Sequence, residues 1–129
     1  MSEIINPQDA ELEEIILGSC LIESKAITLI ADILRPEAFY NEKNLEIYAT
    51  LQSMYRNGQK IDIITVKEEL ARRGKLEFIG GPYTLAHISG RVASSAHLEY
   101  HARILKQKYI RRETILGFHK LLALAADET

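Results

Sequence analysis

Apolar residues recur at three- and four-residue spacing along most of the chain, which is the spacing that lines the buried face of an α-helix. A first helix is predicted where Asn6-Pro7 or Asp9 can cap such a run, and a second, shorter helix follows it. The inward positions of these two helices are Leu12, Ile15, Ile16 and Cys20, then Ile27, Ile30, Ala31 and Leu34. Pro36 then interrupts the pattern, because proline disfavours a helical conformation of the residue before it.

Two longer helices are predicted further along. One runs from about residue 41 to residue 57, with Leu45, Tyr48, Leu51 and Tyr55 on one face, and Gly58 can end it in the left-handed conformation. The last helix follows Ser94-Ser95, which we expect to cap it, and continues to Ala126. We therefore predict an all-α fold, with a compact helical head over residues 1–93 and a long C-terminal helix over residues 94–129.

The stretch GQKIDIITVKEELARRGKLEFIGG, residues 58–81, has the apolar run and the glycines of a strand-turn-helix phosphate site. Thr65 and Glu68, however, have the spacing of a capping box, so we expect a helix to start at Thr65 and to end at Gly74. Gly80-Gly81 before a proline indicates a sharp turn. A phosphate loop needs G-x-x-x-x-G-K-[ST], and the only Gly-Lys pair is followed by leucine. We therefore expect no ATP, magnesium or other cofactor on these residues.

Composition places the chain among small intracellular domains. Its 129 residues are enough for one core, and the single cysteine, Cys20, cannot form an internal disulfide. No leader pattern and no window of about 18 apolar residues is present, so we expect a soluble, cytoplasmic protein. Charge is unevenly distributed: residues 1–46 carry 3 Lys or Arg against 10 Asp or Glu, whereas residues 47–129 carry 13 against 8.

No group of residues has the pattern of a catalytic or metal site. His97 and His101 are spaced to face one way on the last helix, but no carboxylate or cysteine set accompanies them. Glu11, Glu13 and Glu14 are explained as the acidic first turn of the first helix, where the helix dipole favours negative charge. We expect no catalytic residue in this chain.

The last helix carries a basic stripe with one tyrosine among its cations. Such a stripe is a candidate contact for phosphate groups or for a partner protein, and a solvated helix face is the commoner explanation for it. Both interpretations stay open at this point. The stripe consists of Arg103, Lys106, Lys108, Arg111 and Arg112.

The segment TILGFHKLLALAA, residues 114–126, is apolar around almost its whole circumference. A helix that lies on one core shows an apolar stripe and a polar back, so one core cannot cover these side chains. We predict that they form an oligomer interface. Its residues are Ile115, Leu116, Phe118, Leu121, Leu122 and Leu124.

The ordered series of motifs resembles the N-terminal domain of bacterial replicative DNA helicases of the DnaB type. The resemblance covers about residues 7–125. It is carried by Glu11-x-Glu13 before Leu17-Gly18, Phe39-Tyr40, Ile61-Asp62 before Thr65-Val66, Glu69-Leu70, Gly80-Gly81 before Tyr83-x-Leu85, and Tyr100 to Ala102 leading to Lys108 and Arg112. Asn44-Leu45, where the family usually has a His-Arg pair, and the extra His101 depart from the pattern.

The resemblance implies a helical head followed by a helical hairpin, of which the long last helix is the first member. In that family six such domains form a collar on the hexamer, and primase docks on this tier. ATP hydrolysis and DNA translocation belong to a separate RecA-like domain. The resemblance thus implies a fragment that associates with itself, binds primase, is a candidate contact for the helicase loader, and meets DNA weakly or only through the parent protein.

Two alternatives remain. The C-terminal helicase-binding domain of a primase has a similar head and hairpin, although Met1 and the early Pro7 and Glu11 argue for the helicase. The basic stripe alone would fit a stand-alone helical nucleic-acid-binding protein, whose DNA affinity would fall steeply with salt.

Overall fold

The computed structural model of the chain describes residues 9–127, and the Asn6-Pro7 cap lies outside that range. Over these residues the fold is all-helical, as the sequence predicts. The elements are α1 (Ala10–Ile22), α2 (Ile27–Ile30), the short 3-10 helix η1 (Pro36–Ala38), α3 (Glu42–Arg56), α4 (Ile63–Arg72), α5 (Pro82–Gly90) and α6 (Leu98–Ala126). None of these helices is both long and apolar enough to cross a membrane.

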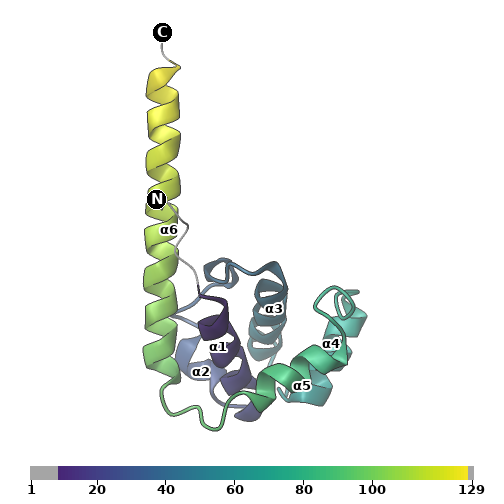
Figure 1. Cartoon of the computed structure of the whole chain (residues 1–129). Coiled ribbons are helices and arrows are strands. Elements are labelled where there is room, and N and C mark those ends of the chain that lie inside the picture. The colour runs from purple at the N-terminus through teal and green to yellow at the C-terminus, as the bar shows by residue number, and fades with distance from the viewer. Residues whose placement is uncertain (1–8, 128–129) are drawn as a thin grey trace.

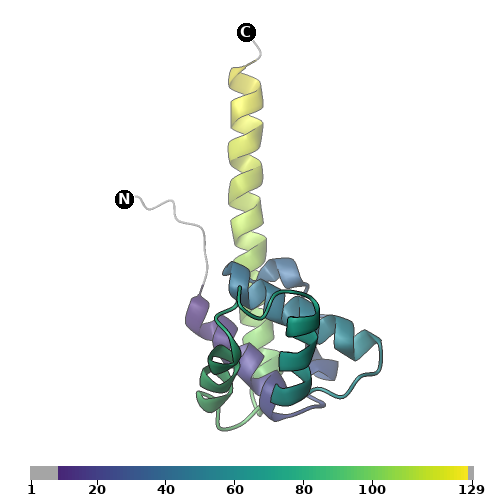
Figure 2. The same cartoon turned by 90° about the vertical axis from the view of Figure 1, so that its right-hand side faces the viewer.

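The first five helices and η1 make a head from which α6 rises as a projecting arm (Figure 1). The first half of α6 packs on α1, α2 and η1, whereas α4 and α5 lie on the other side of the head. A second view shows the upper half of the arm clear of the head (Figure 2). The core is one cluster to which every helix contributes, and its largest fully buried side chains include Tyr48, Phe39, Ile16, Leu17 and Ile27.

Helix α1 packs against α3, α5 and α6, and it approaches α5 most closely at Gly18. A Cβ atom on Gly18 would lie 2.6 Å from the carbonyl oxygen of Ile88 and 2.6 Å from a methyl group of Val92. Both distances are too short for a real contact, so only glycine allows this helix pair to pack.

The helix ends follow the sequence signals in most places. The Asp9 side chain accepts a hydrogen bond from the Leu12 amide at 3.0 Å, and Asn41 caps α3. Arg35 is extended before Pro36. Gly58 and Gly74 have φ angles of 69° and 72° and follow the last residues of α3 and α4, so both are left-handed stops, as predicted.

The start of α4 differs from the prediction. Asp62 is the N-cap: its carboxylate accepts from the Thr65 amide at 2.9 Å, and the Thr65 hydroxyl accepts from the Asp62 amide at 2.9 Å. Thr65 is therefore the third helical residue of a capping box and not its first member, and Glu68 has no part in it. The prediction was wrong because Asp62 also has the right spacing and lies one turn earlier, where the chain leaves the extended conformation.

The start of α6 also differs. The helix begins at Leu98, and its N-cap residue, His97, makes no side-chain capping hydrogen bond. The Ser94 hydroxyl instead accepts from the Ala96 amide at 3.0 Å, inside the connection between α5 and α6. Serine accepts hydrogen bonds from nearby amides in turns as readily as at helix starts, so the predicted cap lies about one turn before the true start of the helix.

Glu13 is fully buried and joins three segments of the head. Its carboxylate accepts hydrogen bonds from the Tyr40 amide at 2.6 Å, the Asn41 amide at 3.4 Å and the Asn44 side-chain nitrogen at 2.9 Å. Burial raises the pKa of the Glu13 carboxyl, and these hydrogen bonds and the charge of Arg112 oppose that rise. Glu13 does lie in the acidic first turn of α1, as predicted, but it is buried in addition, because the chain entering α3 folds over it.

Arg112 fastens α6 to the same region. Its side chain is 4% exposed and donates to the carbonyl oxygens of Ala38 at 3.3 Å and Glu37 at 3.5 Å. The guanidinium also lies 5.2 Å from the ring centre of Tyr40 and 5.5 Å from that of Tyr109. Tyr40 thus contacts Glu13 through its amide and Arg112 through its ring, which connects the arm to the centre of the head.

The first prediction distinguishes the two capping boxes. Thr65→Ala removes the hydroxyl that accepts from the Asp62 amide and should lower the free energy of unfolding by about 1 kcal/mol. Asp62→Ala should also destabilise the protein, whereas Glu68→Ala, the matched control, should leave the midpoint of thermal unfolding unchanged. A loss with Glu68→Ala comparable to that with Thr65→Ala would contradict the observed box.

The second prediction concerns the buried carboxylate. Glu13→Gln keeps the size of the side chain but turns an NH₂ group toward a backbone donor, so it should lower the free energy of unfolding by about 1–3 kcal/mol at pH 7. Glu77→Gln, at an exposed position, is the control. Urea unfolding monitored by circular dichroism gives both values.

The same variant has a defined pH dependence. Because the folded-state pKa of Glu13 lies above 4.5, the folded wild-type protein takes up a proton that the unfolded chain does not as the pH falls toward 4.5. The wild-type protein therefore gains stability relative to Glu13→Gln on acidification through this window. If the difference in free energy of unfolding between the wild-type protein and Glu13→Gln shrank between pH 7 and pH 5, the ionised form of Glu13 would be favoured in the folded state, which would contradict the raised pKa.

Candidate interaction surface

The arm divides at Arg112 into a packed half and a projecting half. Before it, Leu98, Ala102 and Leu105 are buried against the head. After it, no residue of α6 up to Ala126 is buried; Ile115 and Gly117 are half-exposed and the others are exposed. The projecting half is therefore held by its own helical hydrogen bonds and by its continuity with the packed half.

Five of the six residues predicted as an oligomer interface are large exposed apolar side chains. Their exposed fractions are 43% for Leu116, 65% for Phe118, 64% for Leu121, 63% for Leu122 and 66% for Leu124. Several leucines and a phenylalanine gathered on 13 residues of one helix form an apolar patch that monomeric proteins rarely leave open. Their assignment as the interface stays a prediction.

The apolar side chains surround the projecting half. At about 100° per residue, Leu116 continues the line of the head-facing residues of α6, whereas Phe118 and Leu121 point to the opposite side. Leu122 and Leu124 lie on the two flanks. A single neighbour along the head-facing line would cover only one of these five side chains, so the other four would stay exposed.

Gly117 lies in the middle of this surface. A Cβ atom at this position would meet nothing within 4 Å. Glycine in a helix interior costs about 1 kcal/mol relative to alanine, and the packing of this chain offers no steric reason for it. The backbone at Gly117 is open to close approach by another molecule.

The basic stripe does not form one face. Arg112 is buried and holds the carbonyl groups of η1, so it was wrongly included among the candidate phosphate contacts. Arg103 pairs with Glu99 at 2.9 Å on the exposed surface. Counted at about 100° per residue, Arg103 and Lys106 lie on one flank of α6, and Lys108 and Arg111 on the other. The stripe is thus two separate pairs of cations.

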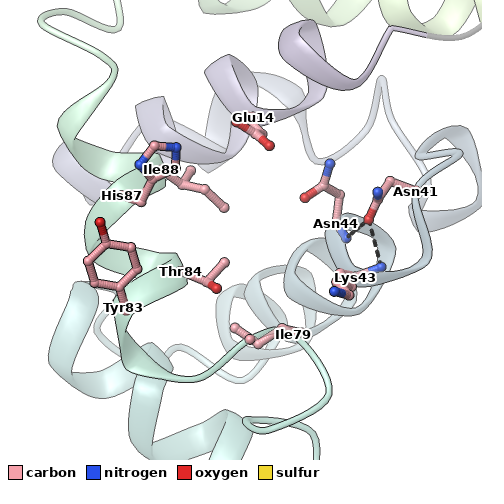
Figure 3. A pocket seen from close by; sticks show the side chains of 10 residues that line it. Glu14, Asn41, Lys43, Asn44, Ile79, Tyr83, Thr84, His87 and Ile88 are labelled. Atoms are coloured by element: carbon pink, nitrogen blue, oxygen red, sulfur yellow. Dashed lines mark hydrogen bonds between the residues drawn. The ribbon is translucent and has the colours of Figure 1, made fainter.

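The head also has a hollow of about 340 Å³ between α1, α3 and α5, shown in Figure 3. Asn41, Lys43 and Asn44 line one side of it and Tyr83, Thr84 and His87 the other, with Glu14 above them. The Glu14 carboxylate pairs with Arg91, and the rings of Tyr83 and His87 stack at 6.3 Å. No pattern in the sequence marks this hollow, because its walls come from three helices far apart along the chain.

The histidines and the cysteine have ordinary surroundings. The rings of His97 and His101 are 6.3 Å apart, and between residues 9 and 127 no three His, Cys, Asp or Glu side chains are placed to hold a metal ion. Cys20 is buried in the core, where loss of water raises the pKa of its thiol to about 12. The thiol is therefore neutral at physiological pH and packs as a small apolar side chain.

Comparison of the chain with known proteins identifies its family. The family model described as DnaB-like helicase N terminal domain matches residues 5–107. The replicative DNA helicase DnaB of Rhodothermus marinus is 43% identical over 108 residues, which are 84% of this chain and 12% of that protein. The replicative DNA helicase DnaC of Bacillus subtilis (strain 168) is 34% identical over 119 residues, 89% of this chain and 26% of that protein.

Two solved structures have the same fold. The crystal structure of the N-terminal domain of DnaB helicase from Mycobacterium tuberculosis aligns with a TM-score of 0.89 at 30% identity, over 95% of this chain and 88% of that one. A DnaB-like replicative helicase, studied together with its interactions with primase, aligns with a TM-score of 0.79 at 28% identity, over 93% of this chain and 28% of that one. The resemblance found in the sequence is confirmed, and the chain belongs to the family of DnaB-like helicase N-terminal domains.

Proposed function

We propose that this chain is the N-terminal assembly and primase-docking domain of a hexameric replicative DNA helicase that acts in chromosome replication. The family membership supports this proposal, and so does the likeness to a DnaB-like replicative helicase that was studied with its interactions with primase. The observation that carries it is the projecting half of α6, whose apolar surface the head does not cover. A domain that works through association needs such a surface.

The chemistry of the helicase belongs to other parts of the parent protein in this proposal. The chain spans 12% and 26% of the two helicases compared above, and its sequence has no G-x-x-x-x-G-K-[ST] loop. ATP and magnesium are therefore assigned to the remainder of the parent. DNA contact through this domain is weak, because the two pairs of cations on α6 face opposite sides. The helicase loader is a further candidate partner, and the proposed place of action is the cytoplasm.

Self-association through the projecting half of α6 is the part of the proposal that needs no other partner, so it can be tested on this chain alone. Burying exposed leucines and a phenylalanine against a second copy removes apolar surface from water, which contributes about 25 cal/mol per Å² before the costs of association. The contact is expected to be two-fold symmetric, since that is the commonest arrangement of homodimers.

The alternative of a primase domain has no support among the two relatives named above, which are helicases.

The third prediction tests the interface. The chain should be a dimer or a larger oligomer at tens of micromolar in size-exclusion chromatography with light scattering. Leu121→Glu or Leu122→Glu should weaken association, because each puts a charge among apolar side chains. Lys120→Glu, on the same turn but on the head-facing side, is the control and should have little effect. A strict monomer, or an oligomer indifferent to both leucine variants, would refute this role for α6.

The fourth prediction concerns primase. Between residues 9 and 127 one helix projects from the head, whereas the family resemblance implies a helical hairpin, so these residues offer only part of such a docking surface. Interfaces lose affinity disproportionately when central contacts are lost. Titration calorimetry with the C-terminal domain of the cognate primase should therefore give a Kd weaker than about 1 μM. Tighter binding would show that the head alone supplies the docking site.

A further inference from the structure

The hollow between α1, α3 and α5 contains a buried hydrogen-bond acceptor that the chain does not use. Asn44 lines the hollow and is 5% exposed. Its side-chain nitrogen donates to the Glu13 carboxylate at 2.9 Å, and this bond fixes the orientation of the amide. The side-chain oxygen of Asn44 is therefore left facing the hollow, as Figure 3 shows, and no donor between residues 9 and 127 bonds to it. A guest that brings a donor to this oxygen is favoured.

The walls of the hollow are suited to a flat apolar body. The buried residues Ile79 and Ile88 line it, and on the side opposite Asn44 stands Tyr83, whose ring stacks with that of His87. Tyr83 is 79% exposed, which is far more than the packing of an aromatic side chain in this chain requires. A hollow of about 340 Å³ between such walls takes one large aromatic side chain.

The charges around the hollow favour a neutral guest. Glu14, the one carboxylate that lines the hollow, is paired with Arg91, whereas Lys43 has no ion-pair partner between residues 9 and 127. A guanidinium or ammonium group would therefore meet an uncompensated positive charge. An anion would face the Asn44 oxygen and the buried Glu13 carboxylate beyond it. A neutral aromatic ring avoids both conflicts, and its face attracts a cation such as Lys43.

An indole ring meets all of these conditions. The tryptophan side chain has a large apolar body, one N–H donor and no acceptor, and it is among the commonest anchors of protein interfaces. Phenylalanine has the shape but no donor, and the tyrosine hydroxyl adds an oxygen at the end of the hollow where the oxygens of Asn44 and Glu14 already lie. The chain itself contains no tryptophan, so the guest is not a second copy of it.

The surface beside the hollow indicates that the indole belongs to a polypeptide. A second hollow of about 530 Å³ shares Asn41 and Lys43 with the first, and the exposed side chains of Tyr40 and Phe78 line it. The two joined hollows are longer than a single side chain needs. A protein segment that places a tryptophan in the first hollow can therefore lay a neighbouring apolar residue in the second.

We infer that the head binds a tryptophan-containing segment of a different protein, with the indole in the hollow between α1, α3 and α5 and its N–H donated to the side-chain oxygen of Asn44. None of the residues that line the two hollows belongs to α6. The inference thus goes beyond the proposed role of the projecting half, and its failure leaves that role untouched.

The fifth prediction tests the indole and its donor with small probes. N-acetyl-tryptophanamide should bind with a Kd of about 0.1–1 mM. Because the chain has no tryptophan, the fluorescence of the probe reports its binding directly. The 3-benzothienylalanine counterpart, which has the shape of indole but sulfur in place of N–H, and N-acetyl-phenylalaninamide should compete at least about fivefold more weakly. Equal binding of the three, or no binding of the tryptophan probe, would overturn the inference.

Two variants locate the probe on the head. Tyr83→Ala should weaken binding about fivefold, and Tyr100→Ala, at an exposed tyrosine of α6, is the control and should leave it unchanged. In folded Asn44→Ala the indole and benzothienyl probes should bind equally, because the acceptor that distinguishes them is gone. A preference for the indole that survives in this variant would refute Asn44 as the acceptor. Should Asn44→Ala not fold, the comparison of probes on wild-type protein still decides.

A flanked probe tests the protein segment. The acetylated and amidated pentapeptide Ala-Leu-Trp-Leu-Ala should bind about tenfold more tightly than N-acetyl-tryptophanamide, because a leucine reaches the second hollow. Phe78→Ala should remove much of this gain and leave the affinity for N-acetyl-tryptophanamide unchanged. Equal affinity of the pentapeptide and the single amino-acid amide would indicate a site for free indole compounds and would overturn the assignment to a protein partner.

Discussion

The carboxylate of Glu13 sets the arrangement on which the rest of the structure depends. An ionised group without water is tolerated only when it is fully hydrogen-bonded, and Glu13 obtains its partners from the chain that enters α3. Tyr40 is placed by this bond and offers its ring to Arg112 of α6. The position of the arm relative to the head is therefore coupled, through two tyrosine contacts and one arginine, to a buried acid in the first helix.

This coupling explains how half of α6 can project without support from the head. Arg112 is the last residue of α6 that the head buries, and it is held by carbonyl groups, by two aromatic rings and by the nearby negative charge. An arginine that is bonded on several sides fixes both the rotation and the tilt of the helix at this point. The side chains that follow it are consequently presented in defined directions.

The division of labour in the molecule follows from this geometry. The head is a closed core whose polar groups are largely satisfied by one another, and its hollow between α1, α3 and α5 is lined by mixed polar and apolar side chains. The arm exposes large apolar side chains to water, which is unfavourable in free energy, and folding of the single chain does not bury them. The proposed function would explain this cost, because assembly and docking require exposed apolar surface.

The sequence by itself determined the helical periodicity, the stops at Gly58 and Gly74, the break at Pro36, the family and the excess of apolar residues at positions 115–124. These depend on local conformation or on order along the chain, and neighbouring residues decide them. Only the tertiary structure decided that Glu13 is buried, that Arg112 is an anchor and not a phosphate contact, and that the side-chain oxygen of Asn44 faces a hollow. Each of these depends on contacts between segments that lie about 30 or 75 residues apart, as the Glu13–Asn44 and Arg112–Ala38 bonds show, and the spacing of residue types does not encode such contacts.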